Sequence, residues 1–254
     1  TLRQLAAEGC SILYISHKLD EIQALCHTAT VLRGGRVSGH CRPAEETPQS
    51  MARLMIGGEL PVCEHSPADG RGELRLRLAG LSHASADPFG TDLRDIHLDV
   101  HAGEIVGIAG VSGNGQQELL QAISGEETIA EKFPVQICGV EAGRLNAARR
   151  RRLGLCFVPE ERLGRGAVPS MSLADNAVLT AARNAALVRG GFLAYTRARR
   201  FASECIERFN VRCGGPQAVA RSLSGGNLQK FIIGREILQT PRLLVCAQPT
   251  WGVD

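Results

Sequence analysis

The sequence predicts an α/β fold divided into two units. Short apolar runs alternate with helical stripes along most of the 254 residues, which is the rhythm of helices packed on a sheet. A glycine-rich loop at 110–115 lies between a predicted strand and a predicted helix. A stretch at 61–72 collects Pro, Gly and charge without periodicity, and we interpret it as a linker. The predicted units are therefore residues 1–60 and 73–254.

The first unit combines helical stripes with short apolar runs. Residues 2–6 have helical spacing without an initiator Met or a capping residue, so we expect the chain to begin inside a helix. An apolar run at 11–15 predicts a buried strand, and a helical stripe follows at 19–26. Residues 31–37, around a Gly-Gly pair, predict a hairpin. A helix around 51–55 completes the unit.

The second unit restarts the alternation of strands and helices. Strands are predicted at 74–78, 93–100 and 104–109, and the last of these leads into the glycine-rich loop and a helix. Further strands are predicted at 135–137, 155–158 and 242–246, with a mostly helical insert at 172–210. The last strand is expected to leave an unpaired sheet edge.

Composition excludes several classes of protein. The net charge of +3 comes from 29 basic and 26 acidic side chains, a balance that gives no reason to expect a nucleic-acid partner. The basic run 149–152 is interpreted as a solvated helix face. Nine scattered cysteines without a Cys-x-x-Cys pair predict small buried side chains and no metal site. Without an export signal or an apolar run of about 18 residues, we expect a cytoplasmic protein.

The segment 110–117 is the first candidate binding site. Its glycines have the spacing of the phosphate-binding loop G-x-x-x-x-G-K-[ST], in which backbone N–H groups and a helix N-terminus face phosphate oxygens. Two alternatives are a simple glycine turn and a dinucleotide fingerprint with Glu118 in place of its third glycine. The lysine and hydroxyl are replaced by glutamines. The candidate residues are Gly110, Gly113, Asn114, Gly115, Gln116 and Gln117.

The second candidate segment is Leu223-Ser-Gly-Gly-Asn227, which precedes an apolar helix. Ser224, Gly225, Gly226 and Asn227 place a hydroxyl and bare N–H groups at a helix N-terminus, which suits a phosphate. The alternative is a Ser-capped helix after a glycine turn. This segment resembles the signature of ABC-type ATPases.

Further motifs extend this resemblance over nearly the whole chain. His17, within 15–21, resembles the switch histidine at the end of a first ATPase half. The second half resembles the simple-sugar and nucleoside importer branch, with Glu160 at the loop that usually carries glutamine. Residues 247–254, including Gln248 and Asp254, resemble the segment from the magnesium strand to the D-loop. Family members hold two complete halves in one polypeptide, so the resemblance implies a fragment that ends at the D-loop of its second half.

The resemblance also implies two nucleotide sites formed by head-to-tail pairing of the halves. His17 and the signature would serve the site built on the first half, and both match the family pattern. The site built on the second half departs from that pattern. There Ala247 stands where the family usually has the carboxylate that holds magnesium, and Gln248 stands where it usually has the general base. Loss of a general base costs about 10²–10⁴ in rate. We therefore expect ATP as ligand, Mg²⁺ only at the first-half site, and no ATP hydrolysis by this chain alone.

Phe89, in Asp87-Pro-Phe-Gly90, is a candidate for stacking on adenine, and its alternative role is a loop anchor.

The resemblance implies an importer ATPase on the inner face of the cell membrane, with permease subunits, a solute-binding protein and the rest of its own chain as partners. Two other functions remain open. One is a non-catalytic nucleotide-sensing module, and the other is a soluble ABC-type protein in DNA repair or translation.

Overall fold

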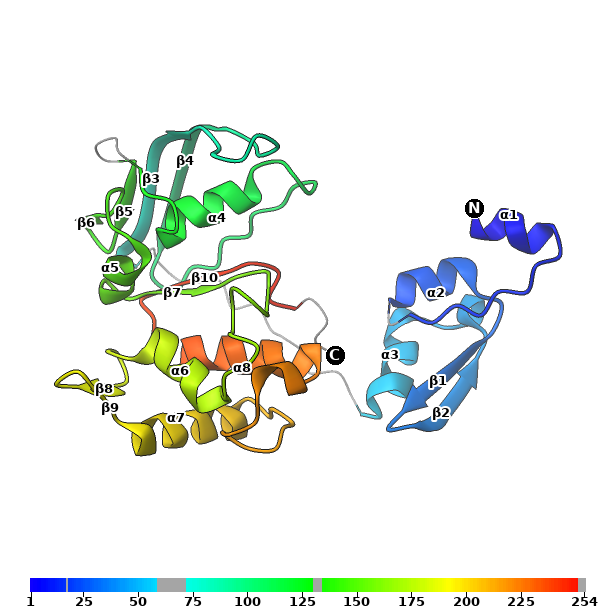
Figure 1. The fold of residues 1–254 in the computed structure, drawn as a ribbon. Coiled ribbons are helices and arrows are strands. Elements are labelled where there is room, and N and C mark those ends of the chain that lie inside the picture. Colours follow the sequence, from blue (N-terminus) through cyan, green and yellow to red (C-terminus); the bar gives the residue numbers. More distant parts are fainter. Residues whose placement is uncertain (17, 59–71, 130–133, 251–254) are drawn as a thin grey trace. The chain divides into compact units, whose positions relative to one another are not determined.

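The computed structural model describes residues 1–16, 18–58, 72–129 and 134–250, and the chain divides into two compact units, Thr1–Pro67 and Ala68–Asp254 (Figure 1). Two predicted site residues, His17 and Asp254, lie outside the described residues. Nearly all of the predicted linker lies outside them as well. Within the described residues, no helix is long and apolar enough to cross a membrane.

The N-terminal unit is built on a two-stranded antiparallel hairpin. The predicted hairpin is confirmed, since the two strands pair from Ala29 with Cys41 to Arg33 with Arg36. Thr47 and Ser50 form a reciprocal capping box at the start of the last helix, with hydrogen bonds of 3.1 and 3.0 Å. The elements are α1 (Leu2–Ala7), α2 (Leu19–Leu25), β1 (Ala29–Arg33), β2 (Arg36–Cys41), a 3₁₀ turn (Pro43–Glu45) and α3 (Pro48–Ile56).

The predicted strand at 11–15 is wrong. The segment has no regular structure, and the side chains of Leu13 and Ile15 are 90% and 89% exposed. A strand requires a neighbour for its backbone N–H and C=O groups. In the described part of this unit, β1 and β2 pair only with each other, so the apolar run has no sheet to join.

The second unit contains a four-stranded antiparallel sheet and a two-stranded parallel one. The order of the first sheet is β4-β3-β5-β6, and α4 packs on it through Leu119 and Ile123 in the core that holds Leu76 and Leu78. Figure 1 shows α4 beside these strands. The elements are β3 (Leu74–His83), β4 (Leu93–His101), α4 (Gln116–Ser124), β5 (Val135–Ile137), β6 (Val140–Glu141), α5 (Ala147–Arg152), β7 (Leu155–Val158) and β10 (Leu243–Cys246).

A helical part with its own core lies between β7 and β10 in the sequence. Phe231 and Ile232 are buried there against small residues such as Ala177 and Ala202. The predicted helical insert is confirmed, and it also contains a short hairpin. The elements are α6 (Leu173–Ala181), β8 (Val188–Arg189), β9 (Phe192–Leu193), α7 (Tyr195–Arg208), a 3₁₀ turn (Ala220–Ser222) and α8 (Gly225–Ile237).

The predicted strand at 104–109 is also wrong. Ile105 is 90% exposed and Ile108 is 54% exposed, and the segment has no ladder bonds. In the described residues, β7 and β10 pair in parallel only with each other. The run leading into the glycine-rich loop therefore has an apolar strand composition but no paired neighbour, and β10 keeps the predicted free edge.

The basic run 149–152 does not form a uniformly solvated face. Arg150 is fully buried, and burial lowers its pKa to about 10. Its guanidinium donates to the carbonyls of Ile123 at 2.9 Å and Ala122, which belong to the last turn of α4, and to those of Gly143 and Leu145. Arg150 thus satisfies the C-terminal carbonyls of α4 that have no partner within the helix.

Candidate nucleotide site

The glycine-rich loop leads directly into α4. Gly115 is the N-cap residue of this helix, with φ at +96°, a left-handed conformation that favours glycine. The Gln116 side chain folds back on the loop. Its Oε1 accepts from the N–H of Asn114 at 3.1 Å, and its Nε2 donates to the carbonyl of Val111 at 3.0 Å.

This folded-back amide changes what the loop offers to an anion. The N–H of Asn114 is one of the donors that a phosphate-binding loop presents, and here it is shared between Gln116 Oε1 and the carbonyl of Val111, the latter at 3.3 Å. The next side chain, Gln117, is exposed and carries no hydroxyl. The loop therefore keeps its glycine geometry and a helix N-terminus but lacks a cationic side chain at position 116.

Phe89 lies at the tip of a turn close to this loop in the fold. Its side chain is 98% exposed, so a ring face is open to a ligand. The following Thr91 donates through Oγ1 to the carbonyl of Gly113 at 2.7 Å. The turn and the glycine-rich loop are thus directly hydrogen-bonded, and the alternative role of Phe89 as a packed loop anchor does not agree with its exposure.

Two predicted residues meet at the ends of the parallel strands. Glu160 follows β7 and Gln248 follows β10, and Gln248 Nε2 donates to Glu160 Oε1 at 3.0 Å. The N–H of Ala247 donates to the carbonyl of Val158 at 2.9 Å, which extends the ladder to this point. Gln248 has φ at +43°, in the left-handed region that is uncommon for residues other than glycine.

These residues do not fit a magnesium ion. Mg²⁺ requires near-octahedral oxygen ligands and is usually held through carboxylates or a hydroxyl next to phosphate. Position 247 is alanine, position 248 is an amide and position 117 is an amide, which leaves the Glu160 carboxylate. Among the described residues, no group of three or more His, Cys, Asp or Glu side chains is arranged to hold a metal.

The signature segment begins α8. Ser224 is the N-cap residue, and its Oγ accepts from Asn227 Nδ2 at 2.8 Å. Asn227 Oδ1 in turn accepts from the N–H of Arg212 at 2.7 Å. Gly225 and Gly226 occupy the first turn, where N–H groups have no carbonyl partner within the helix. This end of α8 has the donors that an anion needs.

The structure separates the two candidate segments. α4, which begins at the glycine-rich loop, packs in the core of the antiparallel sheet, and α8, which begins at the signature, packs in the helical core. Gln248 and Glu160 lie together at the edge of the parallel pair of strands. The structure therefore joins Gln116 to Asn114, Gln248 to Glu160 and Ser224 to Asn227, and it places the loop and the signature on different cores.

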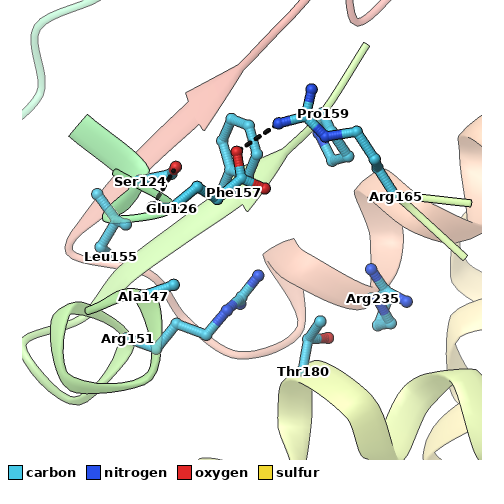
Figure 2. Close-up of a pocket in the computed structure, with 10 residues that line it drawn as sticks. All are labelled: Ser124, Glu126, Ala147, Arg151, Leu155, Phe157, Pro159, Arg165, Thr180 and Arg235. Carbon is cyan, nitrogen blue, oxygen red and sulfur yellow. Dashed lines mark hydrogen bonds and ion pairs between the residues drawn. The ribbon is translucent and has the colours of Figure 1, made fainter. Parts of the chain in front are cut away.

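A cavity of about 110 Å³ lies beside this strand pair (Figure 2). Phe157 of β7 and the adjacent Pro159 line one side, and Arg151, Arg165 and Arg235 also line it. These arginines are already engaged, since Arg165 pairs with Glu126 and the other two contact the carboxylate of Glu236. Two of the residues that line the cavity, Arg151 and Arg235, thus belong to a polar network around Glu236.

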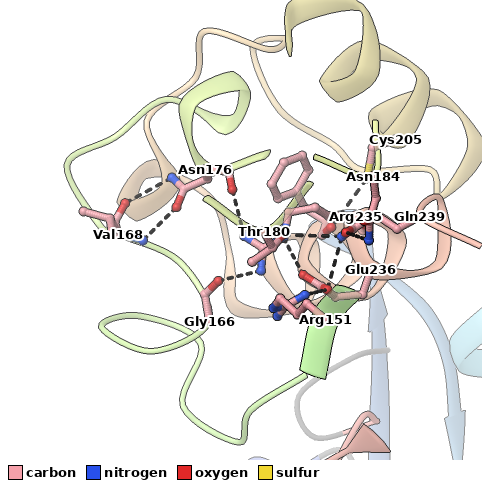
Figure 3. Close-up of polar contacts among 11 residues, drawn as sticks. Arg151, Gly166, Val168, Asn176, Thr180, Asn184, Cys205, Arg235, Glu236 and Gln239 are labelled. Atoms are coloured by element: carbon pink, nitrogen blue, oxygen red, sulfur yellow. Dashed lines mark hydrogen bonds and ion pairs between the residues drawn. The ribbon is translucent and has the colours of Figure 1, made fainter. Parts of the chain in front are cut away.

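The network itself holds α8 in place (Figure 3). Arg235, 2% exposed, donates to Glu236 at 3.0 Å and to the carbonyls of Asn176 and Gly166 at 3.1 and 2.9 Å. Arg151 reaches Glu236 from α5 at 2.7 Å. Burial alone would raise the pKa of Glu236, but these two arginines outweigh burial and hold the pKa below its ordinary value. The helix that carries the signature is thus connected to α5 and α6.

Several of these residues are not identified from the sequence. Thr91 is not part of any sequence motif. Arg150 belongs to a run of four arginines that is typical of a surface helix, so its burial is not predicted. A signal does exist for Arg235 and Glu236, because two adjacent charges interrupt the apolar stripe of Phe231, Ile232, Ile233 and Ile237.

Comparisons with known proteins agree with this geometry. A family model described as ABC transporter matches residues 93–251. The nucleoside import ATP-binding protein NupA of Lactococcus lactis is 36% identical over 253 residues, which are 100% of this chain and 50% of that protein. The glucose import ATP-binding protein TsgD13 of Haloferax volcanii is 38% identical over 259 residues, 100% of this chain and 46% of that protein. The chain spans about half the length of the curated relatives it matches.

Solved structures support the fold independently. A dimeric ATP-binding cassette in a post-hydrolysis state, bound to ADP and Pi, superposes with a TM-score of 0.57 at 22% identity, covering 70% of this chain and 76% of that one. The predicted fold class, a mixed α/β P-loop ATPase fold with a helical part, is confirmed. From its loop, its signature and these matches, the chain belongs to the ABC transporter family of ATP-binding domains.

Proposed function

We propose that this chain is part of the energy-coupling ATPase of an importer for simple sugars or nucleosides. Its relatives include import ATP-binding proteins for nucleosides, glucose, ribose and xylose. The chain would act on the cytoplasmic face of a membrane, with permease subunits and a solute-binding protein as partners. Residues 1–60 would be the end of a first ATPase half, 61–72 a linker, and 73–254 most of a second half.

The two candidate sites have different roles in this proposal. His17 and the signature at Ser224–Asn227 would complete a hydrolytic, magnesium-dependent site on the first half. The loop of this chain, with Gln116, Gln248 and Glu160, would form a second site that binds ATP without hydrolysing it.

The single observation that carries the assignment of a non-hydrolytic second site is the contact between Gln248 and Glu160. A general base must accept a proton from the attacking water. The Gln248 carboxamide has no such basic group, and its Nε2 is directed to Glu160 as a donor. In this proposal, Gln248, Ala247 and Gln116 occupy the positions of the general base, the metal carboxylate and the phosphate-binding lysine. The second site therefore lacks all three groups.

The test is an ATP titration of the chain with magnesium and with chelator, followed by phosphate release, after circular dichroism has verified folding. We expect weak binding, equal within about twofold in the two conditions because the site has no metal ligands, and no phosphate release. A matched variant, Q116K/A247D/Q248E, should make ATP binding depend on magnesium. Magnesium-dependent turnover by the unmodified chain would contradict the proposal.

A further inference from the structure

The turn that presents Phe89 is held by its own polar groups. Asp87 Oδ1 accepts from the N–H of Phe89 at 2.9 Å, and the Asp87 carbonyl accepts from the N–H of Gly90 at 2.9 Å. Ser85 Oγ accepts from the N–H of Asp87 at 3.2 Å. An Asx turn of this kind fixes the backbone on both sides of the aromatic residue. The exposed ring of Phe89 is therefore attached to a backbone of fixed conformation.

Thr91 fastens this turn to the phosphate loop and to the helix behind it. Its Oγ1 donates to the Gly113 carbonyl at 2.7 Å, and its N–H donates to Glu118 Oε1 at 2.9 Å. Gly113 belongs to the loop, and Glu118 lies in the first turn of α4. The backbone of Thr91 and its side chain therefore make separate connections to the two parts of the phosphate-binding element.

Glu118 contributes a hydrogen bond to the turn as well as a negative charge at the start of α4. A carboxylate in the first turn of a helix is favourable in any protein because of the helix dipole. Here one of its oxygens also accepts a backbone N–H from a segment 27 residues earlier. A ring and a loop held in one rigid unit bind two ends of one ligand with less loss of freedom than two independent segments would.

We propose that Thr91 and Glu118 are positioning residues that fix the ring of Phe89 relative to the phosphate loop, so that the site distinguishes a nucleoside triphosphate from inorganic triphosphate. This inference rests on the proposed function, in which the loop binds ATP. The base stacks on Phe89 and the phosphates lie on the loop, and Thr91 sets the spacing between them.

The test compares ATP with inorganic tripolyphosphate by calorimetry on the complete chain. Stacking of a base on an aromatic ring corresponds to about 5- to 150-fold in affinity, so ATP should bind at least fivefold more tightly than tripolyphosphate. F89A should bring this ratio close to one. T91V should reduce the ratio several-fold, because it weakens ATP binding more than tripolyphosphate binding, whereas T91S, which keeps the hydroxyl, should behave as the unmodified chain.

Glu118 provides a second pair of variants in case T91V folds poorly. E118Q keeps an oxygen that can accept the N–H of Thr91 and should preserve the ratio, whereas E118L should reduce it. Equal weakening of both ligands by T91V or E118L would mean a merely structural role and would overturn the inference. Equal binding of ATP and tripolyphosphate by the unmodified chain would overturn it too, leaving the proposed loop site intact. Binding of neither ligand would overturn the proposed ATP site and this inference together.

Discussion

Gln248 Nε2 donates to Glu160 Oε1 across 3.0 Å, and this bond joins the ends of two parallel strands. By the resemblance described above, the position of Glu160 usually carries glutamine and the position of Gln248 usually carries glutamate. The chain therefore has one amide and one carboxylate in exchanged places. In this chain the two side chains are hydrogen-bonded. In the proposed function, the exchange leaves the end of β10 without a general base.

Replacing Gln248 by glutamate tests this exchange. Q248E substitutes a second carboxylate for the donor, so an attraction becomes a repulsion between two acids. Because both side chains are exposed, we expect a loss of no more than about 1 kcal/mol in the free energy of unfolding. Urea unfolding at pH 7 measures it.

The matched control is the double variant E160Q/Q248E. It restores one amide and one carboxylate, so its unfolding free energy should return to that of the unmodified chain, with a measurable coupling energy between the two positions. If the two single substitutions simply add, the contact contributes nothing to stability.

Gln116 should limit the affinity of the loop for phosphates. Q116K removes one of the two acceptors of the Asn114 N–H and adds a positive charge. Charge-assisted bonds of about 1.5–3 kcal/mol correspond to roughly 10- to 150-fold tighter tripolyphosphate binding. The gain should diminish with salt. Q117K adds the same charge at the neighbouring exposed position and serves as control. An equal gain in both variants would show that the position of the charge is unimportant.

Much of the fold can be predicted from periodicity, and its failures have a common cause. β7 and β10 are apolar runs that the structure confirms as parallel strands. β7 is buried along its whole length, whereas only Leu243 is buried in β10. The equally apolar runs 11–15 and 104–109 are not strands, because a strand depends on a neighbour that the local pattern does not specify. Periodicity also misses inward-facing charge, since buried Arg150 and Arg235 both donate to carbonyls far away in the sequence.

Glycine spacing predicts a loop that leads into a helix, and the structure confirms that a helix follows Gly115. The phosphate-binding role of the loop stays a prediction. The partners of the site residues were not predictable, because Thr91 with Gly113 and Glu160 with Gln248 are separated by 22 and 88 positions. Contacts of that separation are set by tertiary packing.

Arg150 should be among the side chains that matter most for stability. R150M keeps much of the volume but leaves the carbonyls at the end of α4 without their donor, and each unsatisfied buried polar group costs about 1–3 kcal/mol. We expect a loss of about 2–4 kcal/mol in urea unfolding. R149M, next to it on the exposed face, should change stability by less than about 0.5 kcal/mol. Similar losses in the two variants would contradict this assignment.

The cysteines should differ sharply in reactivity. Burial raises the pKa of Cys156 and Cys205 to about 12 and that of Cys246 to about 11, so few thiolates form there at pH 8. Cys10 is exposed. Alkylation with iodoacetamide, followed by peptide mass spectrometry, should label Cys10 first and these three only after denaturation. Rapid labelling of Cys205 in the folded chain would show that the helical core opens.

Glu236 should make the second unit sensitive to acid. Arg235 and Arg151 hold its pKa below the ordinary value of 4.5 although burial opposes them. A carboxyl group whose pKa is lowered by folding stabilises the fold fully above its unfolded pKa, and this contribution is lost as the pH falls through the folded pKa. E236Q should be less stable than the unmodified chain at pH 7, by about 3–5 kcal/mol, because it leaves Arg235 buried without its carboxylate. The difference in unfolding free energy between E236Q and the unmodified chain should shrink below pH 4.5.

E204Q, which alters an exposed pair with Arg208 at 3.4 Å, should change stability little at any pH. Urea unfolding from pH 3 to 7 measures all three chains, and parallel curves for E236Q and the unmodified chain would mean that Glu236 does not supply the acid sensitivity.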